Sequence, residues 1–165
     1  LTKEHVSRIS VNKAKAVVMA LTSYQNDKNI DSYLIQELLN LYETVYFWPQ
    51  GIYDEKYLTE LLTSEEKSRI IILKRDLNAL KKLLMEQHPD YVGNRLHAGI
   101  LAMNMGCRSF IIAIDSRTIE IGKDTNMPYI LREELEDTIE NKINGEYHLS
   151  IDMPWENIAL WKKQF

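Results

Sequence analysis

Three residues with the chemistry of anion binding and proton transfer stand close together in the middle of the sequence. Asn94, Arg95 and His97 follow the short apolar segment 91–93 and precede an almost wholly apolar stretch. A guanidinium group can hold a carboxylate or phosphate with two hydrogen bonds, and an imidazole can exchange a proton near neutral pH. The segment therefore predicts a site for an acidic substrate, in which Arg95 binds the anion and His97 acts as acid or base.

The same segment is predicted to begin a helix that holds these groups. Asn94 is a natural N-cap, with Arg95 and His97 in the first turn, and Gly99 is expected to let a neighbouring element approach closely. Free N–H groups and the positive end of the helix dipole favour an anion at such a start. Because the helix is apolar on nearly every face, we expect it to be buried, and both polar side chains then need partners.

A purely structural role for these residues is left open. Arg95 would then pair with an acid of the same chain, Asp115 or Asp90, and His97 would hydrogen-bond a backbone carbonyl. Such pairs are also buried in proteins where they take no part in catalysis. An Arg95 that is satisfied by internal acids, with no cleft open beside it, would favour this alternative.

A second charged segment, residues 115–120, follows the clearest apolar run of the sequence. Asp115, Arg117 and Glu120 are predicted to bind substrate, either by orienting His97 or by hydrogen-bonding a sugar or ribose hydroxyl. The alternative is that Asp115 caps a helix while Arg117 and Glu120 pair on its surface.

Apolar runs of strand length alternate with stretches of helical periodicity. This alternation is typical of an α/β fold with a doubly wound, mostly parallel Rossmann-like sheet, in which ligands bind beyond the carboxyl ends of the strands. With 165 residues, no internal repeat and no linker, residues 1–165 are predicted to form a single domain. The predicted strands cover residues 15–21, 44–48, 69–73, 91–93, 109–114 and 128–130.

Composition and missing motifs exclude several classes of function. The chain has 20 basic and 24 acidic residues and a net charge of -4, which does not indicate nucleic-acid binding. The loop at 22–27 has no glycine and no G-x-G-x-x-G pattern occurs, which argues against NAD or FAD. Cys107, the single cysteine, reads as a small core residue, and the scattered histidines predict no metal site. No segment has the pattern of a signal peptide or a transmembrane helix.

Two stretches of the sequence resemble the polysaccharide pyruvyl transferase family, in its C-terminal half. They are residues 90–100, which contain Arg-Leu-His-Ala, and residues 111–121, which contain Asp-x-Arg-x-x-Glu; residues 46–51 and 54–58 are also similar to family members. The resemblance implies a transferase that moves the enolpyruvyl carbons of phosphoenolpyruvate onto two sugar hydroxyls as a cyclic ketal, without a metal or other cofactor. By the matching motif, Arg95 would bind phosphoenolpyruvate and His97 would be the general acid or base.

The resemblance also implies a fold like the two-domain B-type glycosyltransferases, with the site in a cleft between two Rossmann-like halves. Phosphoenolpyruvate carries both a carboxylate and a phosphate, and Arg95, His97 and a helix start are too few groups to hold both. Further cations are therefore expected from an N-terminal half of the same chain, and a first residue that is Leu rather than Met fits that expectation.

The other expected partner is a carbohydrate acceptor, and the expected location is the cytoplasm, at the membrane periphery if the acceptor is lipid-linked. Two further functions stay open. One is a B-type glycosyltransferase that uses a nucleotide sugar, with Glu120 on the ribose; the other is a non-catalytic binding module.

Overall fold

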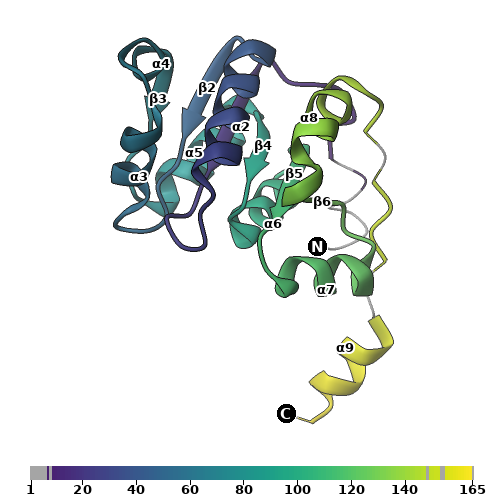
Figure 1. The fold of residues 1–165 in the computed structure, drawn as a ribbon. Helices are drawn as coiled ribbons and strands as arrows, with labels where there is room; N and C mark the ends of the chain where they lie inside the picture. Colours follow the sequence, from purple (N-terminus) through teal and green to yellow (C-terminus); the bar gives the residue numbers. More distant parts are fainter. Residues whose placement is uncertain (1–6, 8, 148, 153–154, 165) are drawn as a thin grey trace.

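The computed structural model describes residues 7, 9–147, 149–152 and 155–164. Within this range one sheet of six strands runs in the order β3-β2-β1-β4-β5-β6, and every strand pair in it is parallel (Figure 1). This confirms the predicted doubly wound α/β fold. The strands are β1 (Ala16–Ala20), β2 (Thr44–Phe47), β3 (Ile70–Ile72), β4 (Asp90–Gly93), β5 (Ser109–Ala113) and β6 (Tyr129–Leu131).

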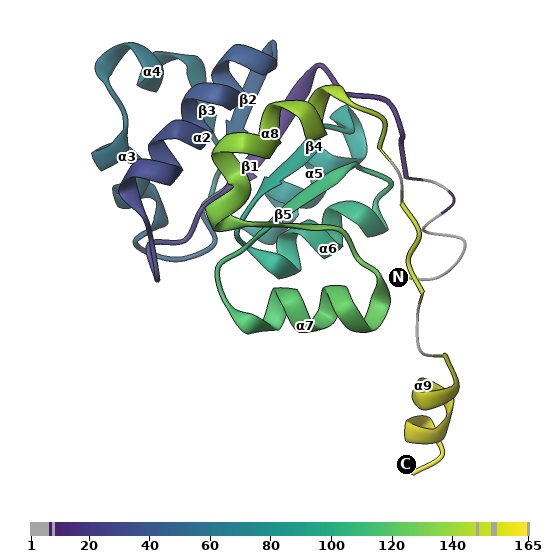
Figure 2. The same ribbon diagram turned by 45° about the vertical axis from the view of Figure 1, so that its right-hand side comes forward.

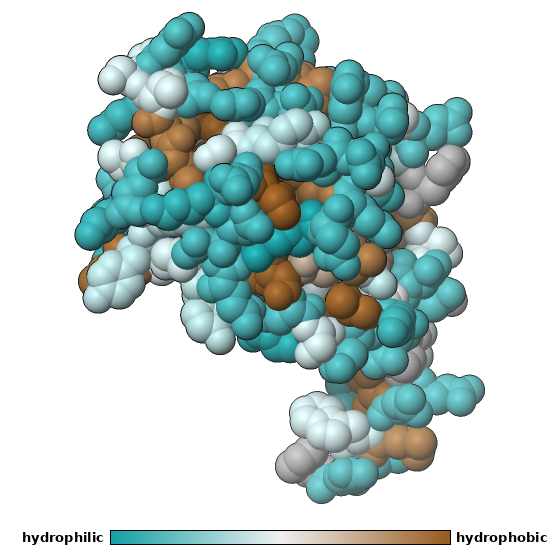
Figure 3. Space-filling model, viewed as in Figure 1, coloured by the Kyte–Doolittle hydropathy of each residue, from teal (hydrophilic) through white to brown (hydrophobic). Residues whose placement is uncertain are grey.

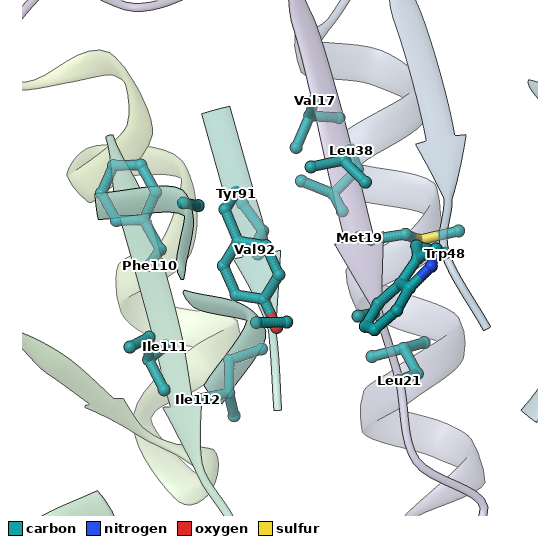
Figure 4. Close-up of a cluster of buried hydrophobic side chains, with 14 of the residues drawn as sticks. Val17, Met19, Leu21, Leu38, Trp48, Tyr91, Val92, Phe110, Ile111 and Ile112 are labelled. Atoms are coloured by element: carbon teal, nitrogen blue, oxygen red, sulfur yellow. The ribbon is translucent and has the colours of Figure 1, made fainter. Parts of the chain in front are cut away.

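The central strands form the core because their runs of apolar residues are covered on both faces. Every residue of β4 and β5 is buried, as expected for strands in the middle of a parallel sheet. Figure 4 shows Met19 of β1, Val92 of β4 and Ile111 of β5 within one cluster of buried side chains. The rigid centre of the sheet therefore carries the loops that follow β1, β4 and β5.

Helices cover both faces of this sheet. α2 (Lys28–Leu41) and α8 (Leu135–Asn144) pack together on one face, where the Tyr33 hydroxyl donates to the Glu136 carbonyl at 3.0 Å. α5 (Leu77–Gln87) and α6 (Leu96–Asn104) lie on the other (Figures 1 and 2). The remaining elements are α3 (Asp54–Leu61), α4 (Ser64–Arg69), α7 (Ser116–Thr125), the 3₁₀ turn η1 (Arg132–Glu134) and α9 (Trp155–Lys162).

Two helices differ from the sequence-based expectation. α4 was not predicted because it has no apolar stripe; none of its residues is buried, and a capping box between Thr63 and Glu66 stabilises its start. The sequence predicts that the helix after residue 115 ends at Gly122, but α7 continues to Thr125. A Cβ at Gly122 would lie 2.4 Å from the Tyr129 ring, so this glycine permits close packing on β6 rather than ending the helix.

The last helix stands apart from the sheet. α9 projects from the body in Figures 1 and 2, and none of its residues is buried. The space-filling view shows a largely hydrophilic face with separate hydrophobic patches, and α9 below it carries residues of both kinds (Figure 3). Within the described ranges, no helix is long and apolar enough to cross a lipid bilayer.

Candidate functional site

A pocket of about 130 Å³ opens beyond the carboxyl ends of the central strands. The sequence order of the strands reverses between β1 and β4, and this reversal is the point where open α/β sheets bind ligands. Residues from the loops after β1, β2, β4 and β5 all contribute to the pocket wall. The sheet topology therefore places the candidate site where the sequence predicted it.

Five of the six predicted site residues meet at this pocket. Asn94, Arg95 and His97 line one part of the wall, and Asp115 and Arg117 line another. The sixth, Glu120, lies further along α7 on an exposed surface and is not among the residues that line the pocket. The grouping expected from the two charged segments is thus present, apart from Glu120.

Asn94 does not cap α6 as expected. The N-cap position is Arg95, which makes no side-chain capping bond. Asn94 lies one residue earlier, beside β1, and its Oδ1 accepts a hydrogen bond from the backbone N–H of Thr22 at 2.8 Å. The side chain is almost fully buried, and among the described residues its Nδ2 has no hydrogen-bond partner. Asn94 therefore joins the loops after β4 and β1 and keeps a donor unused beside the pocket.

Two glycines allow this close packing around the start of α6. A Cβ at Gly93 would lie 2.3 Å from the carbonyl oxygen of Ala20, so a side chain there would push β4 away from β1. A Cβ at Gly99 would lie 2.5 Å from Cγ1 of Ile111. The predicted close approach at Gly99 is confirmed, and its neighbour is β5.

Tyr91 fixes the backbone where α6 begins. Its hydroxyl donates to the Arg95 carbonyl at 2.8 Å. Burial raises the pKa of Tyr91 above the usual value, so the hydroxyl keeps its proton and remains a donor.

Arg95 forms an ion pair within the chain, but with neither of the acids that the sequence suggested. Its Nη2 lies 2.7 Å from Oδ1 and 2.5 Å from Oδ2 of Asp54 at the start of α3. Asp90 begins β4 and lies at the amino edge of the sheet, where it pairs with Arg108. Asp115 pairs with Arg117. Asp54 was not among the predicted site residues, although it begins the segment 54–58 that resembles the family and lies shortly after the carboxyl end of β2.

His97 is exposed, contrary to the expectation of a buried imidazole. It lies in the first turn of α6, on the side that faces away from the sheet core, and needs no buried partner. His97 lines both this pocket and a neighbouring one of about 360 Å³, and Gln50 is also shared by the two. His97 therefore lies at the boundary between the two pockets.

Asp115 caps α7 as predicted. Its Oδ1 accepts from the backbone N–H of Arg117 at 3.1 Å. The Arg117 guanidinium turns back to Oδ2 of the same carboxylate at 2.5 Å, so the expected surface pair of Arg117 with Glu120 is wrong. The side-chain hydrogen bond from Arg117 lowers the pKa of Asp115 below its ordinary value. The pair is ionised at neutral pH.

The positive charge at the pocket is already compensated. Arg95 is neutralised by Asp54 and Arg117 by Asp115. In the part of the chain that the structure describes, no group of three or more His, Cys, Asp or Glu is arranged to hold a metal ion. The shortage of cations for a ligand with two anionic groups is therefore larger than the sequence suggested.

The purely structural alternative for Arg95 meets one of its two conditions. The guanidinium is satisfied by an internal acid, but a pocket is open beside it. Its Nε is buried without a partner in the described ranges, as is Nδ2 of Asn94. Buried donors without acceptors are costly, and both of these donors belong to residues that line the pocket.

The fold is shared with a larger enzyme. The structure of Methanocaldococcus jannaschii UDP-GlcNAc 2-epimerase in complex with UDP-GlcNAc and UDP matches with a TM-score of 0.56 and 14% identity, over 99% of this chain and 49% of that one. The chain therefore spans about half the length of the epimerase, and the likeness supports the expected B-type glycosyltransferase-like fold. No curated protein sequence matches the chain.

The family comparison concerns the segment that carries most of the pocket. A family model described as polysaccharide pyruvyl transferase matches residues 5–116. This range includes Asn94, Arg95, His97 and Asp115 and stops just before Arg117. Because the match covers more than half of the 165 residues, the chain belongs to the polysaccharide pyruvyl transferase family.

Proposed function

We propose that this chain is one Rossmann-like half of an enzyme that transfers the enolpyruvyl carbons of phosphoenolpyruvate to a sugar as a cyclic ketal, in polysaccharide biosynthesis. One observation carries the proposal. Asn94, Arg95 and His97 meet at the switch-point pocket, inside the range of the family match, and the Arg95 side chain is partly exposed there. The carboxylate and phosphate of phosphoenolpyruvate supply acceptor oxygens for a guanidinium group.

In this proposal Arg95 and Asn94 bind the donor anion and His97 moves a proton. Two sugar oxygens form bonds to C2 of phosphoenolpyruvate, and the bond from C2 to the phosphate oxygen breaks. Of the two hydroxyl protons, one ends on the methylene carbon and one on the released phosphate. His97 either protonates that carbon or accepts a hydroxyl proton, a task suited to an imidazole near neutral pH.

The second charged segment is assigned to the sugar side of the same site. Asp115 and Arg117 line the pocket together with His97, within reach of a ligand held by Arg95. They would orient His97 or hydrogen-bond a sugar hydroxyl. Glu120, further along α7, would contact only a part of the substrate that extends beyond the pocket.

We further propose that an N-terminal half of the same chain completes the site. The compensated charges at Arg95 and Arg117 support this, because a cleft partner would have to bring additional cations. The match to 49% of the epimerase chain is consistent with it. The proposed partners are phosphoenolpyruvate and a carbohydrate acceptor, with no metal or other cofactor. The proposed location is the cytoplasm, at the membrane if the acceptor is lipid-linked.

The test is an assay of transfer from phosphoenolpyruvate to envelope glycans by the full-length protein. The transfer is measured as release of phosphate and as formation of an acid-labile ketal. We expect His97→Ala to lower turnover by about 10²–10⁴-fold, with little change in unfolding free energy because the side chain is exposed. Lys82→Ala on α5 is the matched control, since Lys82 is exposed and does not line the pocket. Full turnover in His97→Ala contradicts its assignment. Binding of nucleotide sugars but not of phosphoenolpyruvate favours a B-type glycosyltransferase.

A further inference from the structure

Asp54 lies behind the pocket rather than in its wall, and its carboxylate is bound to Arg95. We infer that Asp54 is a positioning residue that holds the Arg95 guanidinium in the orientation in which it receives the donor anion. This inference rests on the proposed function of the pocket, and it adds a residue that neither the motif nor the family match assigns to the site.

The contacts of Asp54 join three separate segments. Its Oδ1 accepts from the backbone N–H of Ser23 at 3.2 Å, in the loop after β1. Its Oδ2 accepts from the backbone N–H of Gly51 at 2.6 Å, in the loop after β2. Arg95, at the start of α6, binds both oxygens. A single carboxylate thus fixes Arg95 relative to two loops at the carboxyl edge of the sheet.

Both side chains of the ion pair between Asp54 and Arg95 are largely buried. The Asp54 side chain is 0% exposed and that of Arg95 is 22% exposed. A buried carboxylate is tolerated only when charged or N–H donors surround it, and here Arg95 is its charged partner. The Arg95 side chain is therefore restrained to the position in which it can satisfy Asp54.

Gly51 leaves the space that the ion pair fills. A Cβ at this position would lie 2.8 Å from Nη2 of Arg95 and 2.9 Å from Oδ1 of Asp54. Any side chain at residue 51 would push the two charged groups apart or out of place. The loop after β2 thus contributes a donor to Asp54 and also the room for Arg95.

The restraint leaves part of the Arg95 side chain open to a ligand. Asp54 engages Nη2, and the side chain, which is 22% exposed, also lines the pocket, so a ligand there can reach its exposed part. An arginine that is already ordered loses less conformational entropy when it binds an anion. Because the charge of Asp54 offsets that of Arg95, the expected gain in affinity for the anion comes from the fixed orientation of Arg95 rather than from net positive charge.

The first test is Asp54→Asn in the full-length protein. This change keeps the size of the side chain and one acceptor oxygen but removes the charge that holds Arg95. We expect KM for phosphoenolpyruvate to rise about tenfold or more, as for the loss of one charge-assisted hydrogen bond, with a smaller change in kcat. Calorimetric binding of phosphoenolpyruvate should weaken by the same factor.

Asp31→Asn is the matched control. Asp31 is also buried, at 3% exposure, but its partner is the Tyr57 hydroxyl and it does not line the pocket. We expect this variant to change stability without changing KM. An equal rise in KM in both variants would mean that general loosening of the fold is responsible, and would overturn the inference.

Two further variants separate positioning from a direct contact with substrate. In the Arg95→Ala background, Asp54→Asn should cause no additional rise in KM, because Asp54 affects binding of the donor anion through Arg95. Gly51→Ala, which keeps both charged groups but crowds them, should also raise KM. If the enzyme is active, an unchanged KM in Asp54→Asn would overturn the positioning role. Effects of the two substitutions on KM that multiply in the double variant would overturn it as well. A wild-type protein that neither binds nor consumes phosphoenolpyruvate would overturn the proposed function and this inference with it.

Discussion

The guanidinium of Arg108 and the carboxylate of Asp90 form a buried ion pair at the amino edge of the sheet, with Nη2 2.6 Å from Oδ2 and side-chain exposures of 0% and 2%. The Tyr42 hydroxyl donates to Oδ2 of Asp90 at 2.7 Å, and Arg108 also donates to the Ile143 carbonyl at 3.0 Å. Burial alone would lower the pKa of Arg108, but the hydrogen bond and charge of Asp90 raise it, so Arg108 stays charged. This pair links β4, β5 and α8 at the edge opposite the pocket.

Breaking this pair is expected to destabilise the protein strongly. Asp90→Ala leaves the Arg108 charge buried without its partner, which typically costs about 3–5 kcal/mol. Urea denaturation of the protein should show this loss. KM for phosphoenolpyruvate should stay unchanged, because Asp90 lies at the edge of the sheet away from Arg95.

Glu43→Ala is the control for that measurement. Glu43 pairs with Lys15 at 3.3 Å on the surface, where both side chains are largely exposed. Such pairs contribute little, so the unfolding free energy should change by less than about 1 kcal/mol. Equal losses in the two variants would contradict the stabilising role of the buried pair.

The sheet was predictable because each of its strands carries a local signal. Residues 110–114 are apolar without interruption, and the structure forms β5 at Ser109–Ala113 with every residue buried. α4 carries no such signal, since its residues are polar, none of them is buried, and the capping box of Thr63 and Glu66 stabilises its start. Periodicity detects elements that bury a face and misses those that do not.

The grouping of the site residues was also predictable, but their partners were not. Parallel strands end at a shared edge, so the residues that follow β4 and β5 had to lie close together. The acid that binds Arg95 is 41 residues away in sequence, and the guanidinium reaches it across the end of β1. Asn94 has the residue type of a cap, yet the adjacent Thr22 N–H takes its oxygen instead. Which partner each side chain binds depends on the geometry of the loops, and the spacing of residues in the sequence does not determine that geometry.

Cys107 is expected to be unreactive in the folded protein. It is 1% exposed, and burial, together with the charge of Asp90, raises the pKa of its thiol to about 12. Relative to an ordinary thiol, the reactive thiolate at pH 8 is then lower by on the order of 10³-fold. Labelling with a thiol reagent should be correspondingly slow in the native protein and fast in urea. Equal rates in the two conditions would show that Cys107 is not the core residue that the sequence and the structure indicate.

The pKa of the Asp115 carboxyl and the pH dependence of the stability should both report on the pairing of Asp115 with Arg117. The hydrogen bond from Arg117 lowers the pKa of Asp115 below the ordinary value of 3.8. The folded state therefore binds this proton less readily than the unfolded state. The stabilisation from the pair is present above about pH 4 and disappears as the pH falls through the lowered pKa. We expect it to be small, because the Arg117 side chain is 70% exposed.

Two-dimensional NMR of the side-chain carboxyls measures this pKa directly. In Arg117→Ala the Asp115 midpoint should move up toward 3.8, while the carboxylate continues to cap α7. The difference in unfolding free energy between wild type and Arg117→Ala should shrink as the pH is lowered below 4, because protonated Asp115 no longer attracts Arg117. A wild-type midpoint at or above 3.8 would mean that Arg117 is not held by Asp115 in solution. Arg117 would then be available to a ligand in the pocket without first having to break an ion pair.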